Sequence, residues 1–169
     1  MKRRIHLLTS LVATLFLTGC MGYQLGGSRP DGIETVYLAP VVNKTGETAI
    51  ELPVTQALRE RIQNDGRLKL VNDASQADAV IEVELVKFKL KAIAFQRKQK
   101  TTAREFRMRI DAVASLKSTT TDEILSESKT YGNANFTFDS DLTNAKRQAT
   151  PRAAYELAEY MVDDLIEQW

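Results

Sequence analysis

The sequence predicts an α+β domain in which an antiparallel sheet carries helices on one face. Apolar and polar residues alternate along several segments, which is the period of a half-buried strand. Two other segments repeat their apolar residues every three to four positions, as an amphipathic helix does. The segments follow one another in the order β-α-β-β-β-β-α, and a run of strands between two helices is typical of this fold class.

The first 19 residues are typical of a secretory signal peptide. Three basic residues precede an apolar run, Ile5–Leu17, which is shorter than the roughly 20 residues that a membrane-spanning helix needs. The run ends in Leu17-Thr18-Gly19-Cys20, which resembles the lipobox of bacterial lipoproteins. Cys20 is the only cysteine, and a free thiol is unusual in an exported protein. We therefore expect Cys20 to carry a lipid; the alternative is an ordinary signal peptide followed by a coincidental cysteine.

A triacylated Cys20 would hold the mature chain stably on a membrane, because two lipid signals already suffice. By resemblance to the bacterial sorting rule, Met21 is not the aspartate that retains lipoproteins in the inner membrane. The expected location is therefore the periplasmic side of an outer membrane. Residues 20–32 are rich in glycine and are expected to form a tether, which leaves residues 33–169 as a single domain.

The first half of the domain contains a strand, a helix and a short strand. Ile33–Val42 is rich in β-branched residues, which favours a strand. Glu51–Asp65 is expected to be helical, because its apolar residues recur on one face at Val54, Leu58 and Ile62. Gly66 fits the stop of this helix, and Leu68–Val71 follows as a short strand.

The next strand begins near Ala79, and its alternation changes phase partway along. Its apolar residues are first Ile81, Val83 and Leu85, and then Val86, Phe88 and Leu90. A phase change of one residue indicates a β-bulge, or a strand that passes into a different environment.

After a polar hairpin loop at Arg97–Ala103, the segment Phe106–Leu116 alternates again as a strand. Ile124–Tyr131 is expected to be a more polar strand near an edge, and Asn133–Ser140 a loop. The closing helix is expected to begin with Thr150 as N-cap and Pro151 in its first turn. Residues 142–149 are expected to add a leading turn to this helix.

The sequence lacks the residue sets of common enzymes. Its one histidine, His6, lies in the signal peptide, which excludes Ser-His-Asp and Cys-His catalytic sites in the mature domain. One cysteine excludes an internal disulfide and any multi-cysteine metal site. No phosphate-binding loop, dinucleotide fingerprint or metalloprotease motif is present. The carboxylate pair Asp163-Asp164 is expected to be solvated surface, so we predict a non-enzyme with no cofactor and no metal.

The net charge of +1 hides two regions of opposite charge. Removing residues 1–19 removes three basic and no acidic residues, which leaves 20 basic against 22 acidic. Nine of the basic residues and only one acidic residue, Glu105, lie between Lys87 and Arg109. That segment carries +8, and the rest of the mature chain therefore carries −10.

If this basic segment forms a hairpin, its cations share one face. Lysines at alternate positions of one strand then lie beside Arg107 and Arg109 of the next, while the opposite face is apolar: Phe88, Leu90, Phe106 and Met108. This pattern predicts an anion-binding surface, suited to an amphiphile with phosphates beside acyl chains. The alternative is a solvated strand whose lysines prevent aggregation of an edge. Nucleic acid is not an expected partner, because the chain is exported and anchored.

Several short motifs, taken in order, resemble the lipopolysaccharide-assembly lipoprotein family, LptE. They are Cys20–Leu25, Val36–Pro40 with Asn43 and Thr45, Leu58–Leu70, Ala77–Ile81 and Ala153–Trp169. Other envelope lipoproteins share part of this plan, including a curli-secretion lipoprotein, activators of peptidoglycan synthases and transport-auxiliary lipoproteins. The alternative function is therefore a periplasm-facing accessory of a secretion system, a transporter or peptidoglycan synthesis.

The resemblance implies two helices packed on a four- or five-stranded sheet, in a chain that sits as a plug within an LptD-like outer-membrane β-barrel. It implies that the chain assists barrel assembly and receives lipopolysaccharide without catalysis. Family members use basic residues near loop ends of the sheet for lipopolysaccharide phosphates. That property maps onto Arg97, Lys98, Lys100 and Arg104, and the charge pattern adds Arg107 and Arg109.

Overall fold

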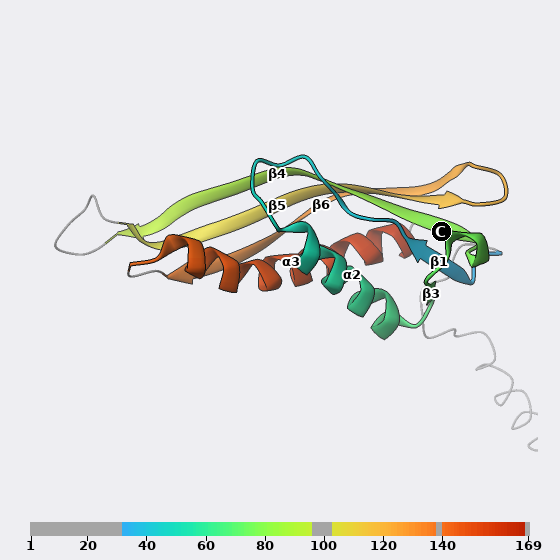
Figure 1. Ribbon diagram of the computed structural model, residues 1–169, viewed down its shortest axis with the longest axis horizontal. Helices are drawn as coiled ribbons and strands as arrows, with labels where there is room; N and C mark the ends of the chain where they lie inside the picture. The colour runs from blue at the N-terminus through green and yellow to red at the C-terminus, as the bar shows by residue number, and fades with distance from the viewer. Residues whose placement is uncertain (1–31, 96–102, 138–139, 168–169) are drawn as a thin grey trace, which may run out of the picture.

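The computed structural model describes residues 32–95, 103–137 and 140–167. Within these ranges a six-stranded sheet has two long helices on one of its faces (Figure 1). The elements in chain order are β1 (Thr35–Leu38), β2 (Val42–Asn43), α2 (Glu51–Asp65), β3 (Lys69–Val71), the 3₁₀ turn η2 (Ala74–Gln76), β4 (Ala79–Phe95), β5 (Ala103–Ser118), β6 (Ile124–Thr137) and α3 (Leu142–Glu167).

The sheet is mixed, which corrects the prediction of a mostly antiparallel sheet of four or five strands. Its order is β3-β1-β4-β5-β6, and β2 pairs separately with β4. Strand β1 is parallel to both β3 and β4, and β2 is parallel to β4. Helix α2 returns the chain to the end of the sheet where β1 began, so that β3 runs in the same direction as β1. The α+β class and the two helices are confirmed.

Strand β4 contains the predicted β-bulge. Leu85 lies opposite Ala112 of β5, and the next paired residue of β4, Lys87, lies opposite Asp111. Val86 is therefore the extra residue, and it is 38% exposed. Beyond it the antiparallel pairing continues with Phe88 and Leu90 on the side that faces the helices.

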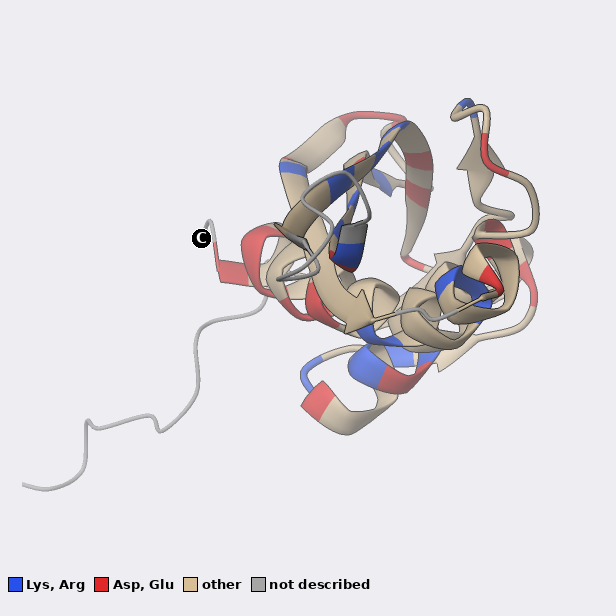
Figure 2. Ribbon diagram, turned by 90° about the vertical axis from the view of Figure 1, so that its left-hand side faces the viewer, with Lys and Arg blue, Asp and Glu red and all other residues tan. Residues whose placement is uncertain are grey.

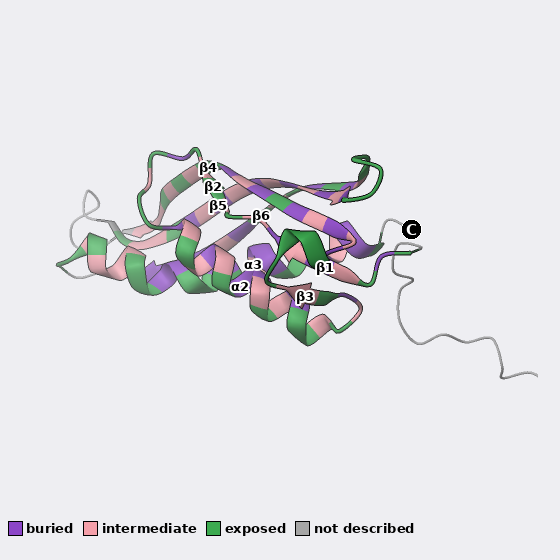
Figure 3. Cartoon of the chain, turned by 45° about the vertical axis from the view of Figure 1, so that its right-hand side comes forward, coloured by how far each residue is buried: buried purple, intermediate pink, exposed green. Residues whose placement is uncertain are grey.

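The core lies between the sheet and the helices. Buried and more exposed residues alternate along the strands (Figure 3), as expected for a sheet covered on one face. Helix α3 contributes small side chains to this core, which let it approach the sheet closely: Ala149, Ala153, Ala154 and Ala158. Helix α2 has the predicted bounds and ends at Gly66, whose positive φ of 74° a glycine adopts easily.

Helix α3 starts earlier than predicted. It begins at Leu142, and the side chain of Asp141 accepts a hydrogen bond from Asn144 N at 2.9 Å, as an N-cap does. Pro151 therefore lies inside the helix, and Thr150 is not its cap. The Thr150 hydroxyl instead donates to the Lys146 carbonyl at 2.8 Å. The helix passes through the proline because its apolar face continues on both sides of it.

The carboxylates Asp163 and Asp164 are not simply solvated, which corrects the expectation for this pair. Asp163 accepts hydrogen bonds from Arg61 of α2 and from Arg67. Asp164 accepts one from the Ser128 hydroxyl of β6 at 2.8 Å. The two carboxylates therefore attach α3 to α2 and to the sheet, which is a structural role.

Strand β6 is longer than predicted and extends through residues 133–137, which were expected to be a loop. Its glycine and asparagines have low strand propensity, but pairing with β5 and packing against α3 override that preference. A Cβ at Gly132 would lie 2.0 Å from the Ala153 carbonyl oxygen and 2.6 Å from Leu157 N. Only glycine fits where β6 meets the backbone of α3.

The start of β1 is fixed by the carboxylate of Asp78. Its Oδ2 accepts hydrogen bonds from Glu34 N at 2.9 Å, from Thr35 N at 2.8 Å and from the Thr35 hydroxyl at 2.8 Å. The two backbone donors are the main reason why the pKa of Asp78 lies below its ordinary value of 3.8. These bonds join two segments 43 residues apart in the chain.

We predict that Gly132→Ala lowers the free energy of unfolding by roughly 2 kcal/mol, because a backbone carbonyl cannot move aside as a flexible side chain can. Urea denaturation of the purified mature chain measures this. Gly46→Ala is the matched control, since a Cβ there meets no atom within 4 Å. Equal stability of the two variants would contradict the close approach of β6 and α3.

We predict that Asp78→Asn lowers the melting temperature at pH 7 and that this difference shrinks below pH 3.8. A carboxylate whose pKa is lower in the folded state stabilises the fold above its unfolded pKa, and this contribution is lost as the pH falls toward the folded pKa. Calorimetry between pH 2 and pH 7 measures the difference. Glu123→Gln, which removes an exposed carboxylate elsewhere, is the control. A difference independent of pH would contradict the role of the charge.

Candidate anion-binding face

The sheet face opposite the helices carries nine polar side chains at alternate positions of β4, β5 and β6. We call them the basic grid. Its three rows, read across the strands, are Lys87–Asp111–Tyr131, Lys89–Arg109–Asn133 and Lys91–Arg107–Asn135. Neighbouring strands are about 4.8 Å apart and alternate residues of one strand about 6.8 Å apart. A group the size of a phosphate can therefore touch cations from two strands.

The grid has five cations and one carboxylate, and so a net charge of +4. The three lysines and Arg107 are exposed, and no described helix covers this face of the sheet (Figure 2). Among the described residues, no ion pair involves any of the three lysines. The cations of this face are therefore available to an anionic ligand.

Arg109, at the centre of the grid, is held in place by two neighbours. Its Nε lies 2.7 Å and its Nη2 2.6 Å from Asp111 Oδ1. Its guanidinium carbon lies 3.5 Å from the centre of the Tyr131 ring, which is a cation–π contact. The hydrogen bond to Asp111 is the main cause of the raised pKa of Arg109. This arginine is rigid and always charged, but Asp111 already neutralises part of its charge.

The rest of the grid is less constrained. Arg107 Nε donates to Asn135 Oδ1 at 2.9 Å, which orients the guanidinium and leaves its Nη groups directed elsewhere. The second carboxylate oxygen of Asp111 is buried and has no hydrogen-bond partner among the described residues. A buried acceptor of this kind favours keeping cations nearby.

Two of the six predicted binding residues, Arg107 and Arg109, lie in the grid. Arg104 is exposed, but the alternation of β5 places it on the same side as Phe106 and Met108, away from the grid. Arg97, Lys98 and Lys100 lie outside the described residues. The prediction that cations of the two strands share one face is confirmed.

The sequence analysis missed the β6 column of the grid: Tyr131, Asn133 and Asn135. These three polar residues alternate with Gly132, Ala134 and Phe136, which is a strand period. The signal was present, but the turn-forming glycine and asparagines favoured a loop.

The apolar side of the hairpin is part of the core, and the prediction that it faces an amphiphile is wrong. Met108 is fully buried, and Phe106 stacks on Phe136 with ring centres 6.0 Å apart. Phe88 is half-buried, and Lys146 Nζ of α3 lies 5.8 Å from its ring centre. Helix α3 covers this side because it begins at Leu142, eight residues before the predicted start.

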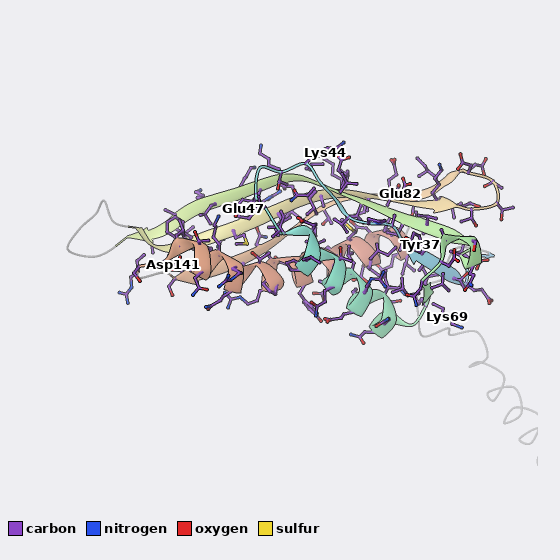
Figure 4. All side chains as sticks on the ribbon, in the orientation of Figure 1. Tyr37, Lys44, Glu47, Lys69, Glu82 and Asp141 are labelled. Atoms are coloured by element: carbon purple, nitrogen blue, oxygen red, sulfur yellow. The ribbon has the colours of Figure 1, made fainter. Side chains whose placement is uncertain are left out.

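Beyond the grid, the same face continues into a shallow groove of about 740 Å³. Its lining combines apolar side chains with carboxylates: Ala39, Pro40, Val42, Val113, Glu82, Glu84 and Glu127. Lys44 forms an ion pair with Glu84 at 2.6 Å, and Figure 4 shows Lys44 and Glu82 along this part of the sheet. The uncovered face is thus basic at one end and acidic at the other.

No metal-ligating cluster of three or more side chains occurs in the part of the chain that the structure describes. Within the same residues, no helix is long and apolar enough to cross a membrane.

The sequence model of the family described as LptE, lipopolysaccharide-assembly, matches residues 33–169. The chain belongs to this family. An LptE chain of this kind is a lipoprotein that acts in lipopolysaccharide assembly, together with the transport machinery. The match covers all the elements that build the basic grid. No curated protein matches the chain.

Several solved structures share the fold of this LptE-family chain. Protein XCC0632 from Xanthomonas campestris has a TM-score of 0.54 at 8% identity, over 80% of this chain and 87% of its own. The hypothetical protein CT253 from Chlamydia trachomatis has a TM-score of 0.50 at 10% identity, over 77% and 94%. Uncharacterized lipoprotein B from Nitrosomonas europaea has a TM-score of 0.46 at 19% identity, over 82% and 89%.

Proposed function

We propose that the basic grid binds the phosphate groups of lipopolysaccharide during its assembly. The observation that carries this proposal is the group of five cations on an uncovered sheet face, in a chain of the LptE family. Arg107 supplies a guanidinium suited to bidentate phosphate contacts, and the lysines supply mobile point charges around it. Arg97, Lys98, Lys100 and Arg104 extend the positive charge of the same hairpin, and we include them in the proposed surface.

The two ends of the uncovered face favour one orientation of the ligand. Glu82, Glu84 and Glu127 repel phosphates from the groove, so the phosphates lie over the grid. The acyl chains cannot lie on the opposite side of the hairpin, because α3 occupies it. They extend instead from the uncovered face, toward a membrane or a partner protein. The contact is non-catalytic, because the grid offers charge and hydrogen bonds but no nucleophile beside a base.

We further propose that Cys20 carries the lipid anchor and that the chain lies on the periplasmic side of the outer membrane. The lipobox and the family support this location. The proposed partner is an LptD-like β-barrel, whose apolar or membrane-facing parts could receive the acyl chains that the fold itself does not cover. Residues 1–19 are the proposed signal peptide and residues 20–32 the proposed tether.

For the ligand, we predict that Lys89→Gln combined with Arg107→Gln weakens lipopolysaccharide binding about tenfold or more, because two charged contacts to phosphate are lost. Fluorescence titration of the purified mature chain with lipopolysaccharide measures the affinity. The loss should shrink at high salt, which screens exposed charges. Lys69→Gln, an exposed lysine of β3 at the other end of the molecule (Figure 4), is the control. If the grid variant binds like this control, the site lies elsewhere.

For the partner, we predict that the full chain purified from detergent-solubilised outer membrane recovers a large β-barrel protein and carries lipid on Cys20. Mass spectrometry of the intact chain and of the recovered proteins measures both. Cys20→Ala should abolish the lipid and reduce the recovery. Recovery of a peptidoglycan synthase alone, or a soluble chain without lipid, would support the accessory function instead.

A further inference from the structure

The two long edges of the sheet differ in how their backbone groups are satisfied. At the β6 edge, α3 supplies partners: the Glu156 carboxylate accepts from Asn133 N, and Arg152 Nη2 donates to the Asn135 carbonyl at 2.9 Å. The Ser126 hydroxyl of the same strand donates to the Leu165 carbonyl at 2.8 Å. Helix α3 therefore protects this edge, as native proteins commonly protect edge strands.

The β4 edge is paired over only part of its length. Its first residues pair with β1, and Glu84 and Leu85 pair with β2, where Lys44 N donates to the Leu85 carbonyl at 2.9 Å. No described strand pairs with this edge beyond Leu85, although β4 continues to Phe95. In Figure 1 this part of β4 runs from the connection between β1 and α2 to the far end of the hairpin. An extended strand laid there would continue the column of β2.

The side chains along this open edge, Val86–Ala94, alternate in kind. Lys87, Lys89 and Lys91 are exposed on the outer face, whereas Phe88 and Leu90 are half-buried on the inner face. A strand that pairs with the edge places its own alternate side chains beside these two sets. The lysines favour carboxylates on the outer side, and the apolar residues favour apolar side chains on the inner side.

The lysines also exclude the wrong partner. A second copy of the same edge would bring like charges together, which destabilises cross-strand pairs. Lysine on an edge strand is a common defence against self-association. Here the defence is selective, because it leaves the backbone donors and acceptors available to a strand of opposite charge.

We infer that the β4 edge at Val86–Ala94 binds an extended segment of a partner protein in which carboxylates alternate with apolar residues. The backbone hydrogen bonds supply affinity, and the lysines supply selectivity. This site is distinct from the phosphate contact proposed above, because it uses the backbone of the edge strand, whereas Arg107 belongs to the central strand β5.

The test uses the full mature chain and a fluorescent nine-residue peptide of alternating glutamate and valine. Fluorescence anisotropy should show saturable binding, and hydrogen exchange should show added protection of amides in Val86–Ala94. The same peptide with alternate backbone nitrogens methylated, on the set that faces the edge, should bind at least tenfold more weakly, because several backbone hydrogen bonds are lost. Both methylation registers are made, and one of them should retain affinity. A lysine–valine peptide should not bind.

Charge variants test the selectivity. Lys89→Glu should weaken binding of the glutamate peptide about tenfold, since an attractive cross-strand pair becomes repulsive. Lys69→Glu on β3 has the same change in net charge and should bind like the unaltered chain. Absence of peptide binding would show that the lysines only prevent aggregation and would overturn the inference. So would equal binding of both methylated peptides, because that result indicates adhesion to the grid by charge alone. Arg107→Gln should leave peptide binding unchanged while lowering lipopolysaccharide affinity, which separates the two proposals.

Discussion

The pairing of β4 with β5 keeps the charged and apolar sides of this molecule apart, and it depends on one extra residue, Val86. A strand sends successive side chains to opposite faces, so an unbroken β4 that buries Ile81, Val83 and Leu85 would also bury Lys87, Lys89 and Lys91. Burying unpaired ammonium groups is strongly unfavourable. The bulge reverses the alternation at the one place where the sequence requires it. Every cation of β4 thereby reaches the uncovered face.

Helix α3 determines what the other face can do. It runs beneath the sheet from Asp141 onward, receives β6 against its backbone at Gly132, and supplies the side chains that satisfy the β6 edge. The apolar half of the hairpin is therefore interior. This arrangement leaves the molecule with one uncovered sheet face and one partly open edge, both on the β4 side, and ligands and partners meet it there.

The sequence predicted the features that follow from periodicity and charge. The long strands, helix α2 and the bulge follow from alternation, and the shared face of the cations follows from hairpin pairing. The parallel pairing of β1 was not predictable from local pattern, because strand direction is set by the path of α2 between β1 and β3. Thr150 and Pro151 are strong helix-start signals, yet tertiary packing carries α3 through them.

The same reasoning explains the candidate site. Arg107 and Arg109 were identifiable from charge, but the Tyr131 ring under Arg109 was not, since it depends on the register of β6 against β5. Asn133 and Asn135 were missed because residues that favour turns in isolation are strand residues when a helix lies against them. Long-range packing, rather than local propensity, decided each of these positions.

The parallel pairing of β1 with the first residues of β4 also sets a distance. Val36 lies opposite Ala79, so the chain enters the domain beside the start of β4, whereas the middle row of the grid, at Lys89, is ten residues farther along that strand. At about 3.4 Å per residue the sheet separates the two points by roughly 34 Å. With an anchor at Cys20, the domain would act as a rigid arm with its attachment at one end and its cationic surface toward the other. The length of β4, and not the flexible tether alone, would then set how far from the attachment point the cations can work.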